Sequence, residues 1–264
     1  MTGARRPVVF MFHGSSGTGE QFFHSSGWRE MADQTGLVAV FPTGLRYRVL
    51  ETGRLTTKWN DFSLAAEIDT NELPPGSDAG APVPADDVSF VDAMVADLQG
   101  GLPIDGRRVY AAGFSNGAGF AARLSVDRAE QLAAAAYSGG GGMPAGAAPA
   151  RPVPTLLSLG TDDPKVIDNV DPTLPALPLD PALILTTPAL SDFFGLYHAA
   201  FGLDPALYGA IADPGVSTLR WPASGLGANG ALLKLVMLEG LRHRYPDTAA
   251  AESWHFFAEH RASA

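Results

Sequence analysis

The sequence predicts an α/β fold in which a mostly parallel sheet is flanked by helices on both faces. Short apolar runs rich in β-branched and aromatic residues alternate along the chain with longer segments of helical spacing. The apolar runs are nearly continuous, as expected for strands that are buried on both faces of a sheet. Strand and helix follow each other in turn, which is typical of parallel sheets.

The expected elements can be placed by their residue ranges. Strands are expected at 8–12, 37–41, 108–112, 133–137, 153–159 and 232–238. Helices are expected at 19–35, 86–98, 116–126, 190–201 and 248–260. Two stretches rich in Pro, Gly and Asp, at about 45–84 and 164–230, interrupt the alternation. We expect binding loops or a lid there, with ordinary surface excursions as the alternative, all within one domain over residues 1–264.

Composition excludes several classes of function. The chain has 264 residues and is 46% apolar, which is enough for one large core. Its 18 basic and 28 acidic residues give a net charge of -10, which argues against nucleic acid or an anionic membrane as partner. There is no cysteine, so disulfides, thiolate metal sites and a cysteine nucleophile are excluded. No apolar run reaches 18 residues, so membrane insertion is not expected.

A Gly-Phe-Ser-Asn-Gly run at 113–117 lies directly between an expected strand and an expected helix. It fits the Gly-x-Ser-x-Gly elbow, in which glycines let the strand and the helix approach closely around a strained serine. Such a turn places the Ser115 hydroxyl at the carboxyl end of the sheet, beside the amide of Asn116 and the helix N-terminus. We therefore expect Ser115 to be a nucleophile; the alternative is a glycine-rich turn with an incidental serine.

A serine hydroxyl needs a base to remove its proton, and in this kind of elbow fold the carboxylate and the histidine follow the serine in sequence. Asp162 and Asp163 both follow the strand expected at 153–159, and either can orient an imidazole. Among the six histidines, His243 alone follows a late strand through a short loop and precedes a final helix. Structural or surface roles are expected for His24, His198, His255 and His260, the last two inside the final helix, with a place in a lid as the alternative for His198.

The oxyanion formed by nucleophilic attack needs a second backbone donor besides Asn116. A His-Gly-Ser run at 13–15 directly follows the first strand. Glycine permits an unusual turn there, so the amide of Ser15 can face the nucleophile. His13 itself is expected to be a structural hydrogen-bonding residue.

These blocks together resemble the polyhydroxybutyrate depolymerase-like esterases, a family of α/β-hydrolases that includes feruloyl esterases. The similar blocks span most of the chain: His-Gly at 13–14, Trp-Asn-Asp at 59–61, Asp-Asp-Val-Ser-Phe at 86–90, the elbow, Gly-Thr-Asp-Asp at 160–163 and Gly-Leu-Arg-His-Arg-Tyr-Pro at 240–246. The family's Gly-Thr-x-Asp pattern selects Asp163 over Asp162. The resemblance implies an α/β-hydrolase fold, a triad of Ser115, Asp163 and His243, and Ser15 and Asn116 as oxyanion donors.

The resemblance also places Trp59 near the active site as an apolar wall for the substrate, with core packing as the alternative. Phe114, next to the nucleophile, is a second substrate-binding candidate. The chain departs from the family pattern in lacking cysteine, in having Tyr245 where tryptophan is usual, and in carrying Leu241 and Arg242 where small residues are usual. Because pocket walls set substrate preference, the resemblance implies the reaction type and not the substrate.

We therefore expect a serine carboxylic ester hydrolase that acts through an acyl-enzyme on small or aromatic acyl esters or on polyesters, without a cofactor or metal. A thioesterase, a peptidase or a catalytically inactive binding module on the same fold are the alternatives. The resemblance implies secretion, with a cytoplasmic location as the alternative because the sequence shows no signal peptide. Since the chain starts almost directly on the first strand, we expect that an upstream segment was removed.

Overall fold

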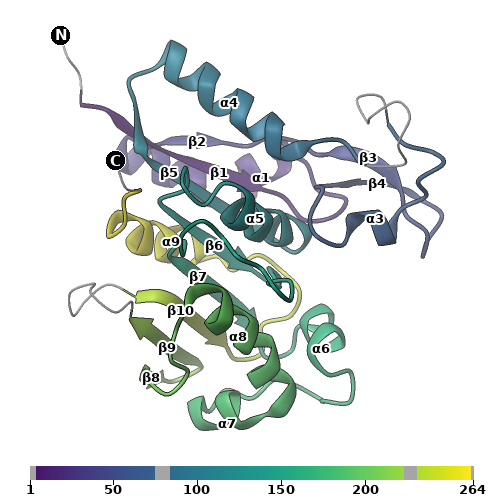
Figure 1. Ribbon diagram of the computed structural model, residues 1–264, viewed down its shortest axis with the longest axis vertical. Helices are drawn as coiled ribbons and strands as arrows, with labels where there is room; N and C mark the ends of the chain where they lie inside the picture. The colour runs from purple at the N-terminus through teal and green to yellow at the C-terminus, as the bar shows by residue number, and fades with distance from the viewer. Residues whose placement is uncertain (1–3, 75–83, 223–230, 263–264) are drawn as a thin grey trace.

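The computed structural model describes residues 4–74, 84–222 and 231–262, and a large twisted sheet runs through its centre (Figure 1). The sheet has eight strands in the order β2-β1-β5-β6-β7-β10-β9-β8. Six of them are parallel to one another: β2 (Val38–Val40), β1 (Arg6–Phe12), β5 (Ile104–Phe114), β6 (Ala134–Ser138), β7 (Thr155–Gly160) and β10 (Ala231–Leu238). The remaining two, β9 (Val216–Pro222) and β8 (Gly209–Asp213), run antiparallel at one edge. The mostly parallel sheet that the sequence predicts is thereby confirmed.

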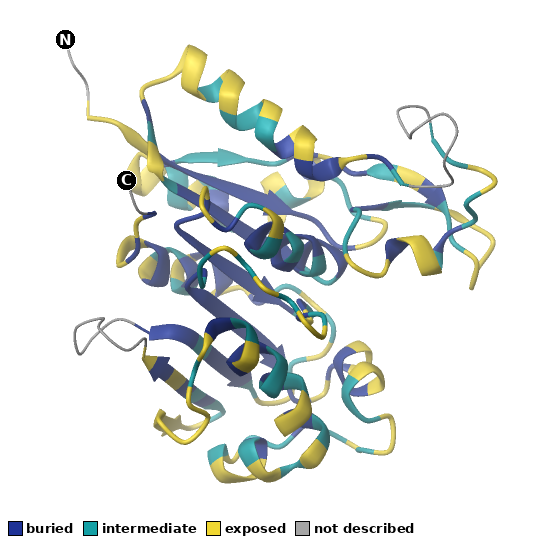
Figure 2. Ribbon diagram, in the orientation of Figure 1, coloured by how far each residue is buried: buried dark blue, intermediate teal, exposed yellow. Residues whose placement is uncertain are grey.

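Helices cover both faces of this sheet, and the central strands between them are largely buried (Figure 2). Alternate residues of β1 show the two layers: Phe10 and Phe12 pack into one apolar cluster, whereas Val9 and Met11 pack into another. The first cluster includes side chains of α4 (Asp87–Gly101), α5 (Asn116–Asp127) and α8 (Pro188–Phe201). The second includes side chains of α1 (Gly19–Ser25), α2 (Trp28–Thr35) and α9 (Ala249–Ala258). The nearly continuous apolar strands of the sequence are explained by this two-sided burial.

The two interruptions of the alternation contain more regular structure than the sequence indicates. The first holds the antiparallel pair β3 (Leu45–Arg48) and β4 (Leu55–Lys58), followed by the short helix α3 (Leu64–Glu67). The second holds α6 (Pro164–Val170), α7 (Pro181–Thr186) and α8, and then β8 and β9, which extend the main sheet. Residues 75–83 and 223–230 of these stretches lie outside the described residues.

Two helix boundaries differ from expectation. The single helix expected at 19–35 is two helices, because the chain turns at Gly27, whose φ of 78° is left-handed and ends regular helix geometry. The final helix ends at Ala258, so His260 lies beyond it rather than inside it. Over the described ranges, no helix is both long enough and apolar enough to cross a membrane.

Candidate active site

The turn between β5 and α5 has the geometry of a nucleophile elbow. Ser115 precedes the first residue of α5 with φ 53° and ψ -121°, a strained conformation for a residue other than glycine. A Cβ atom on Gly113 would lie 2.1 Å from the carbonyl oxygen of Gly117, and one on Gly117 would lie 2.3 Å from that of Phe12. Glycine is therefore required on both sides of Ser115, where strand and helix approach most closely.

The loops that carry Asp163 and His243 leave from neighbouring strands. β7 and β10 pair in parallel, with Gly160 opposite Leu238 at their carboxyl ends. Beyond that point the Gly240 amide donates to the Thr161 hydroxyl at 2.8 Å, and the Asp162 amide donates to the Leu241 carbonyl at 3.2 Å. These bonds tie the two loops together, so the acid and the imidazole are brought to the same edge of the sheet as Ser115.

Ser115, His243 and Asp163 form one hydrogen-bonded relay. Nε2 of His243 lies 2.9 Å from Oγ of Ser115, and Nδ1 lies 2.9 Å from each carboxylate oxygen of Asp163. The Asp163 carboxylate is 1% exposed and also caps α6 by accepting the amides of Lys165 and Val166. Asp162 is exposed, and its carboxylate accepts the Thr161 hydroxyl instead. The structure thus brings together the three residues that the resemblance selects, with Asp163 rather than Asp162 at the imidazole.

The turn after β1 abuts the nucleophile. A Cβ atom on Gly14 would lie 3.2 Å from Cβ of Ser115. Among the described residues, neither the Ser15 amide nor the Asn116 amide has a hydrogen-bond acceptor, and the second amide belongs to the positive end of the α5 dipole. The two turns that meet at Ser115 therefore each carry a backbone donor without an acceptor among the described residues.

His13 is a structural residue of this turn. It is fully buried, its Nδ1 lies 2.7 Å from the Gly14 carbonyl oxygen, and its Nε2 accepts the Gly44 amide at 3.0 Å. Burial lowers the pKa of His13, which favours the neutral imidazole that these two contacts require.

The two substrate-binding candidates differ in their surroundings. Trp59 is fully buried and its ring stacks on Phe120, which leaves no side-chain surface for a substrate and favours the packing alternative. Phe114 is half-buried, and its ring centroid lies 4.9 Å from that of His243. Phe114 is therefore at the site and Trp59 lies beneath it.

Two parts of the site were missed by sequence reasoning. The glycine run after β6 is not among the expected site residues, yet a Cβ atom on Gly140 would lie 2.9 Å from the Ser115 carbonyl oxygen, and one on Gly139 would lie 3.0 Å from the Phe114 ring. The strand β4 was also missed, although the amide of Ser16 donates to its Thr57 carbonyl at 3.0 Å. The glycine run could have been assigned to the site from the sequence, because it directly follows a strand beside the elbow. The contact of β4 could not, because it is made by backbone atoms and leaves no sequence pattern.

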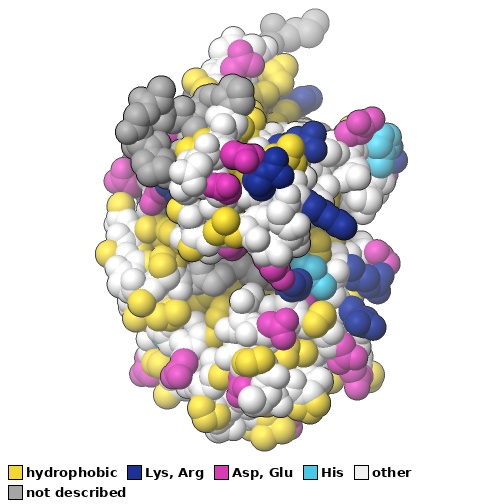
Figure 3. Space-filling view, turned by 90° about the vertical axis from the view of Figure 1, so that its right-hand side faces the viewer, with side chains coloured by type: hydrophobic (Ala, Val, Ile, Leu, Met, Phe, Trp, Pro, Cys, Tyr) yellow, Lys and Arg dark blue, Asp and Glu magenta, His cyan; other side chains and the backbone are white. Residues whose placement is uncertain are grey.

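The arrowheads of the parallel strands in Figure 1 point toward the side of the molecule that faces the viewer in Figure 3. Hydrophobic, acidic and basic side chains are interspersed on this face. In the described part of the chain, no three His, Asp or Glu side chains are grouped so as to hold a metal ion.

Comparison with known proteins gives one family and several structural neighbours. The family model described as "Esterase PHB depolymerase" matches residues 2–153, which include Ser115 and end before Asp163 and His243. The chain is 30% identical over 161 residues to NocK of Nocardia uniformis subsp. tsuyamanensis, a protein designated as an esterase, covering 60% of this chain and 40% of NocK. It is 33% identical over 171 residues to feruloyl esterase B of Piromyces equi, covering 62% of this chain and 27% of that protein. The matched part thus spans less than half of the length of these curated relatives.

The solved structures show the same fold at low sequence identity. Acetyl xylan esterase from Aspergillus awamori matches with a TM-score of 0.60 at 15% identity, over 96% of this chain and 89% of that one. An S-formylglutathione hydrolase from Agrobacterium tumefaciens matches with a TM-score of 0.56 at 15% identity, over 99% of this chain and 86% of that hydrolase. With the mostly parallel sheet described above, these neighbours confirm the α/β-hydrolase fold.

Proposed function

The chain belongs to the PHB depolymerase esterase family, and from that premise we propose that it is a serine carboxylic ester hydrolase that works through an acyl-enzyme. The observation that carries this proposal is the relay from Ser115 Oγ through His243 to Asp163, in which every link is 2.9 Å. Acyl-transfer enzymes of unrelated folds hold their nucleophile, base and orienting acid in this same geometry.

In the first half of the reaction, the Ser115 oxygen attacks the ester carbonyl carbon while Nε2 of His243 accepts the hydroxyl proton. The carbonyl oxygen becomes an oxyanion that accepts hydrogen bonds from the amides of Ser15 and Asn116. Asp163 accepts the Nδ1 proton of the imidazole and stabilises its cation. The imidazolium then gives its proton to the alcohol oxygen as the carbon–oxygen bond breaks, which leaves an acyl group on Ser115.

In the second half, a water molecule takes the place of the alcohol. His243 removes a proton from this water, the resulting nucleophile attacks the acyl carbon, and the Ser115 oxygen leaves with the proton that the imidazole held. The carboxylic acid is released and the starting enzyme is restored. Both halves use the same donors and the same base, so no cofactor is required by the proposal.

We place small or aromatic acyl esters, and polyesters, among the substrates. Support comes from the half-buried Phe114 ring beside His243, which offers an apolar surface at the reacting atoms. The mixed character of the surrounding face, where no single charge predominates, suits an uncharged ester better than a polyanion (Figure 3). Esters of ferulic acid, acetyl esters and short hydroxyalkanoate polyesters are the classes to compare first.

Turnover of the Ser115→Ala variant tests the proposal. We expect kcat to fall by roughly five to six orders of magnitude with the thermal unfolding temperature preserved, because the nucleophile is lost and the core is untouched. A panel of p-nitrophenyl esters of rising chain length, methyl ferulate, polyhydroxybutyrate film, acyl-thioesters and peptides then assigns the substrate class. Ester turnover retained in Ser115→Ala would overturn the acyl-enzyme, and turnover confined to thioesters or peptides would replace the ester assignment.

A further inference from the structure

Residues 57–61, which we call the clamp, join the end of β4 to the turn before α3. Its central residue, Trp59, has no exposed surface. The clamp contacts two turns that are far apart in the sequence: the turn after β1, which carries Ser15, and the start of α5, which carries Asn116. These turns supply the two amides assigned above to the oxyanion.

Three hydrogen bonds hold the first turn to the clamp. The Trp59 indole N–H donates to the His13 carbonyl at 3.1 Å, the Ser16 amide donates to the Thr57 carbonyl at 3.0 Å, and the Thr57 hydroxyl donates to the Gly17 carbonyl at 2.7 Å. Ser16 is held in a left-handed conformation, with φ 68°, which a serine rarely adopts. These bonds lie on both sides of Ser15, so they fix the direction of its amide.

Three more hydrogen bonds hold the second turn. The Asn116 side-chain oxygen accepts the Trp59 amide at 2.7 Å, and its nitrogen donates to the Trp59 carbonyl at 3.1 Å and to Oδ2 of Asp61 at 2.8 Å. Both N–H groups and the oxygen of this amide side chain are therefore used. The backbone amide of the same residue is the second oxyanion donor, so anchoring the Asn116 side chain anchors that donor.

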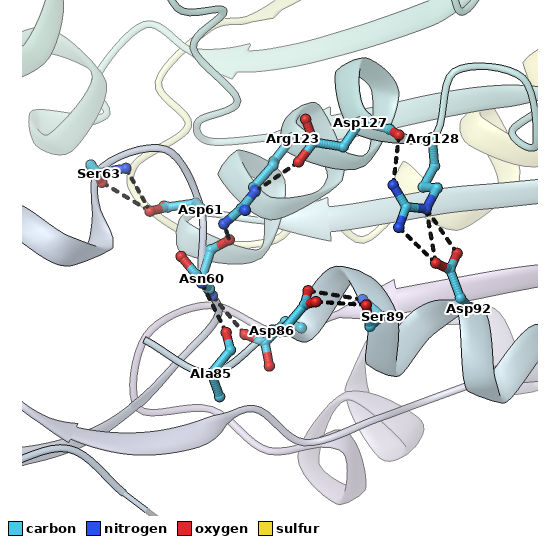
Figure 4. Close-up of polar contacts among 11 residues, drawn as sticks. Asn60, Asp61, Ser63, Ala85, Asp86, Ser89, Asp92, Arg123, Asp127 and Arg128 are labelled. Carbon is cyan, nitrogen blue, oxygen red and sulfur yellow. Dashed lines mark hydrogen bonds and ion pairs between the residues drawn. The ribbon is translucent and has the colours of Figure 1, made fainter. Parts of the chain in front are cut away.

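The clamp is itself fixed from two sides (Figure 4). The Asn60 carbonyl accepts from Arg123 of α5 at 2.8 Å, and the Asn60 amide donates to the Asp87 carboxylate at the start of α4 at 2.7 Å. Oδ1 of Asp61 turns back to accept the amides of Ser63 and Leu64. The clamp is thus held by hydrogen bonds to α4 and α5, which pack on the same face of the sheet.

We propose that Trp59 and Asp61 are positioning residues that set the separation and direction of the two oxyanion donors. Trp59 is the link between them, because its backbone binds Asn116 while its indole binds the carbonyl of His13. Donors stabilise a developing oxyanion only from about 2.7–3.1 Å, so a displacement of either turn lowers the stabilisation of the transition state more than that of the bound ester. This inference rests on the proposed function, and it assigns the clamp to the chemical step and not to substrate binding.

The Trp59→Phe variant removes the indole N–H and keeps most of the apolar ring. We expect kcat to fall roughly 10- to 100-fold with KM within about threefold of wild type, since a lost oxyanion donor costs 10²- to 10³-fold and a displaced one costs less. Affinity for a trifluoromethyl ketone, whose adduct places an oxyanion in the hole, should fall by a factor similar to that of kcat. If Trp59 instead lined the substrate site, KM would rise with kcat nearly unchanged.

The matched control is Trp221→Phe. Trp221 is also fully buried, and its indole N–H also donates to a backbone carbonyl, that of Pro205 at 3.3 Å, but it lies on β9 near the far edge of the sheet. We expect this variant to lose stability as Trp59→Phe does while keeping kcat within about twofold. Equal losses of kcat in both tryptophan variants would overturn the proposal, because the effect would then be a general loss of packing.

If Trp59→Phe does not fold, a second pair of variants tests whether the clamp positions the oxyanion donors. Thr57→Val removes the hydroxyl bond to Gly17, and Thr155→Val removes a 2.8 Å hydroxyl bond to the Val153 carbonyl at the start of β7. We expect a fall in kcat of about 5- to 20-fold for the first and no change for the second. If Thr57→Val leaves kcat and the ketone affinity unchanged while Ser115→Ala abolishes activity, the positioning role of the clamp is wrong and the proposed function is retained.

Discussion

Nδ1 of His243 lies 2.9 Å from both carboxylate oxygens of Asp163, and that carboxylate is almost fully buried. The contact fixes the imidazole so that Nε2 faces Ser115 with its lone pair. It also places a negative charge where the imidazolium of the proposed reaction forms. The pair therefore determines both the tautomer and the electrostatics of the base.

The Asp163→Asn variant tests the role of this pair. We expect kcat to fall by about four orders of magnitude, because an amide cannot hold the required tautomer or stabilise the cation. Thermal stability should change little, since asparagine caps a helix about as well as aspartate and Asp163 caps α6. The control is Asp162→Asn, the exposed neighbour, in which kcat should stay within about twofold. A fall in kcat confined to the Asp162 variant would reassign the acid.

Gly117 tests the packing of the elbow. A Cβ atom there would lie 2.3 Å from the Phe12 carbonyl oxygen. This oxygen belongs to the backbone of β1, so it cannot move without displacing the strand. We expect Gly117→Ala to lower the free energy of unfolding by about 3 kcal/mol or more, measured by urea unfolding. The helical control is Gly100→Ala in α4, where a Cβ atom meets nothing within 4 Å and alanine should be neutral or stabilising by up to about 1 kcal/mol. Similar unfolding curves for the two variants would contradict the close approach of β1 and α5.

Asp87 gives a prediction about pH. Burial is the main cause that raises the pKa of this carboxyl to about 6, against a partly compensating hydrogen bond from Asn60 and the charge of Arg123. The folded state then holds a proton that the unfolded state releases between about pH 4 and pH 6, so this residue's contribution to stability falls as the pH rises through that window. Asp87→Asn keeps an oxygen to accept the Asn60 amide and removes the ionisation.

We therefore expect the stability of Asp87→Asn relative to wild type to increase between about pH 4 and pH 6 and to level off above, by about 2–3 kcal/mol in total at 1.36 kcal/mol per pKa unit. Urea unfolding at a series of pH values measures this difference. The adjacent Asp86→Asn is the control with the opposite sign and a lower window: hydrogen bonds with Ser89 lower the pKa of Asp86, so the stability of this variant relative to wild type should fall as the pH rises toward about 4 and stay level between pH 4 and pH 6. A pH-independent difference for Asp87→Asn would contradict the burial of an ionisable carboxyl at this position.

The part of the fold predicted from the sequence is the part whose strands are buried on both faces. β1, β7 and the second half of β5 appear in the sequence as continuous apolar runs because helices cover them on either side. β8 could not be found in this way, since every residue of Gly209–Asp213 is exposed and burial therefore imposes no apolar pattern on it. The break at Gly27 was visible as a Ser-Ser-Gly stop signal, but apolar spacing continued across it and concealed the change of direction.

In the candidate site, too, some parts could be predicted from the sequence and others could not. Ser115, Asp163 and His243 each follow a predicted strand, and parallel strands bring their carboxyl ends to one edge, so their meeting follows from strand order. The resemblance places Trp59 near the site, but the bonds of the clamp to Ser16 and Asn116 could not be predicted, because they run through backbone atoms of Thr57 and Trp59. Such contacts depend on the path of the chain rather than on residue type.

Covalent labelling of Ser115 tests the central claim most directly. We expect a fluorophosphonate probe to add one adduct to the wild-type protein, mapped to Ser115 by peptide mass spectrometry, and none to Ser115→Ala. Labelling of His243→Ala should be slower by several orders of magnitude, because the serine then lacks its base. The contradicting result is a folded wild-type protein that forms no adduct at high probe concentration, or one whose adduct lies on another residue.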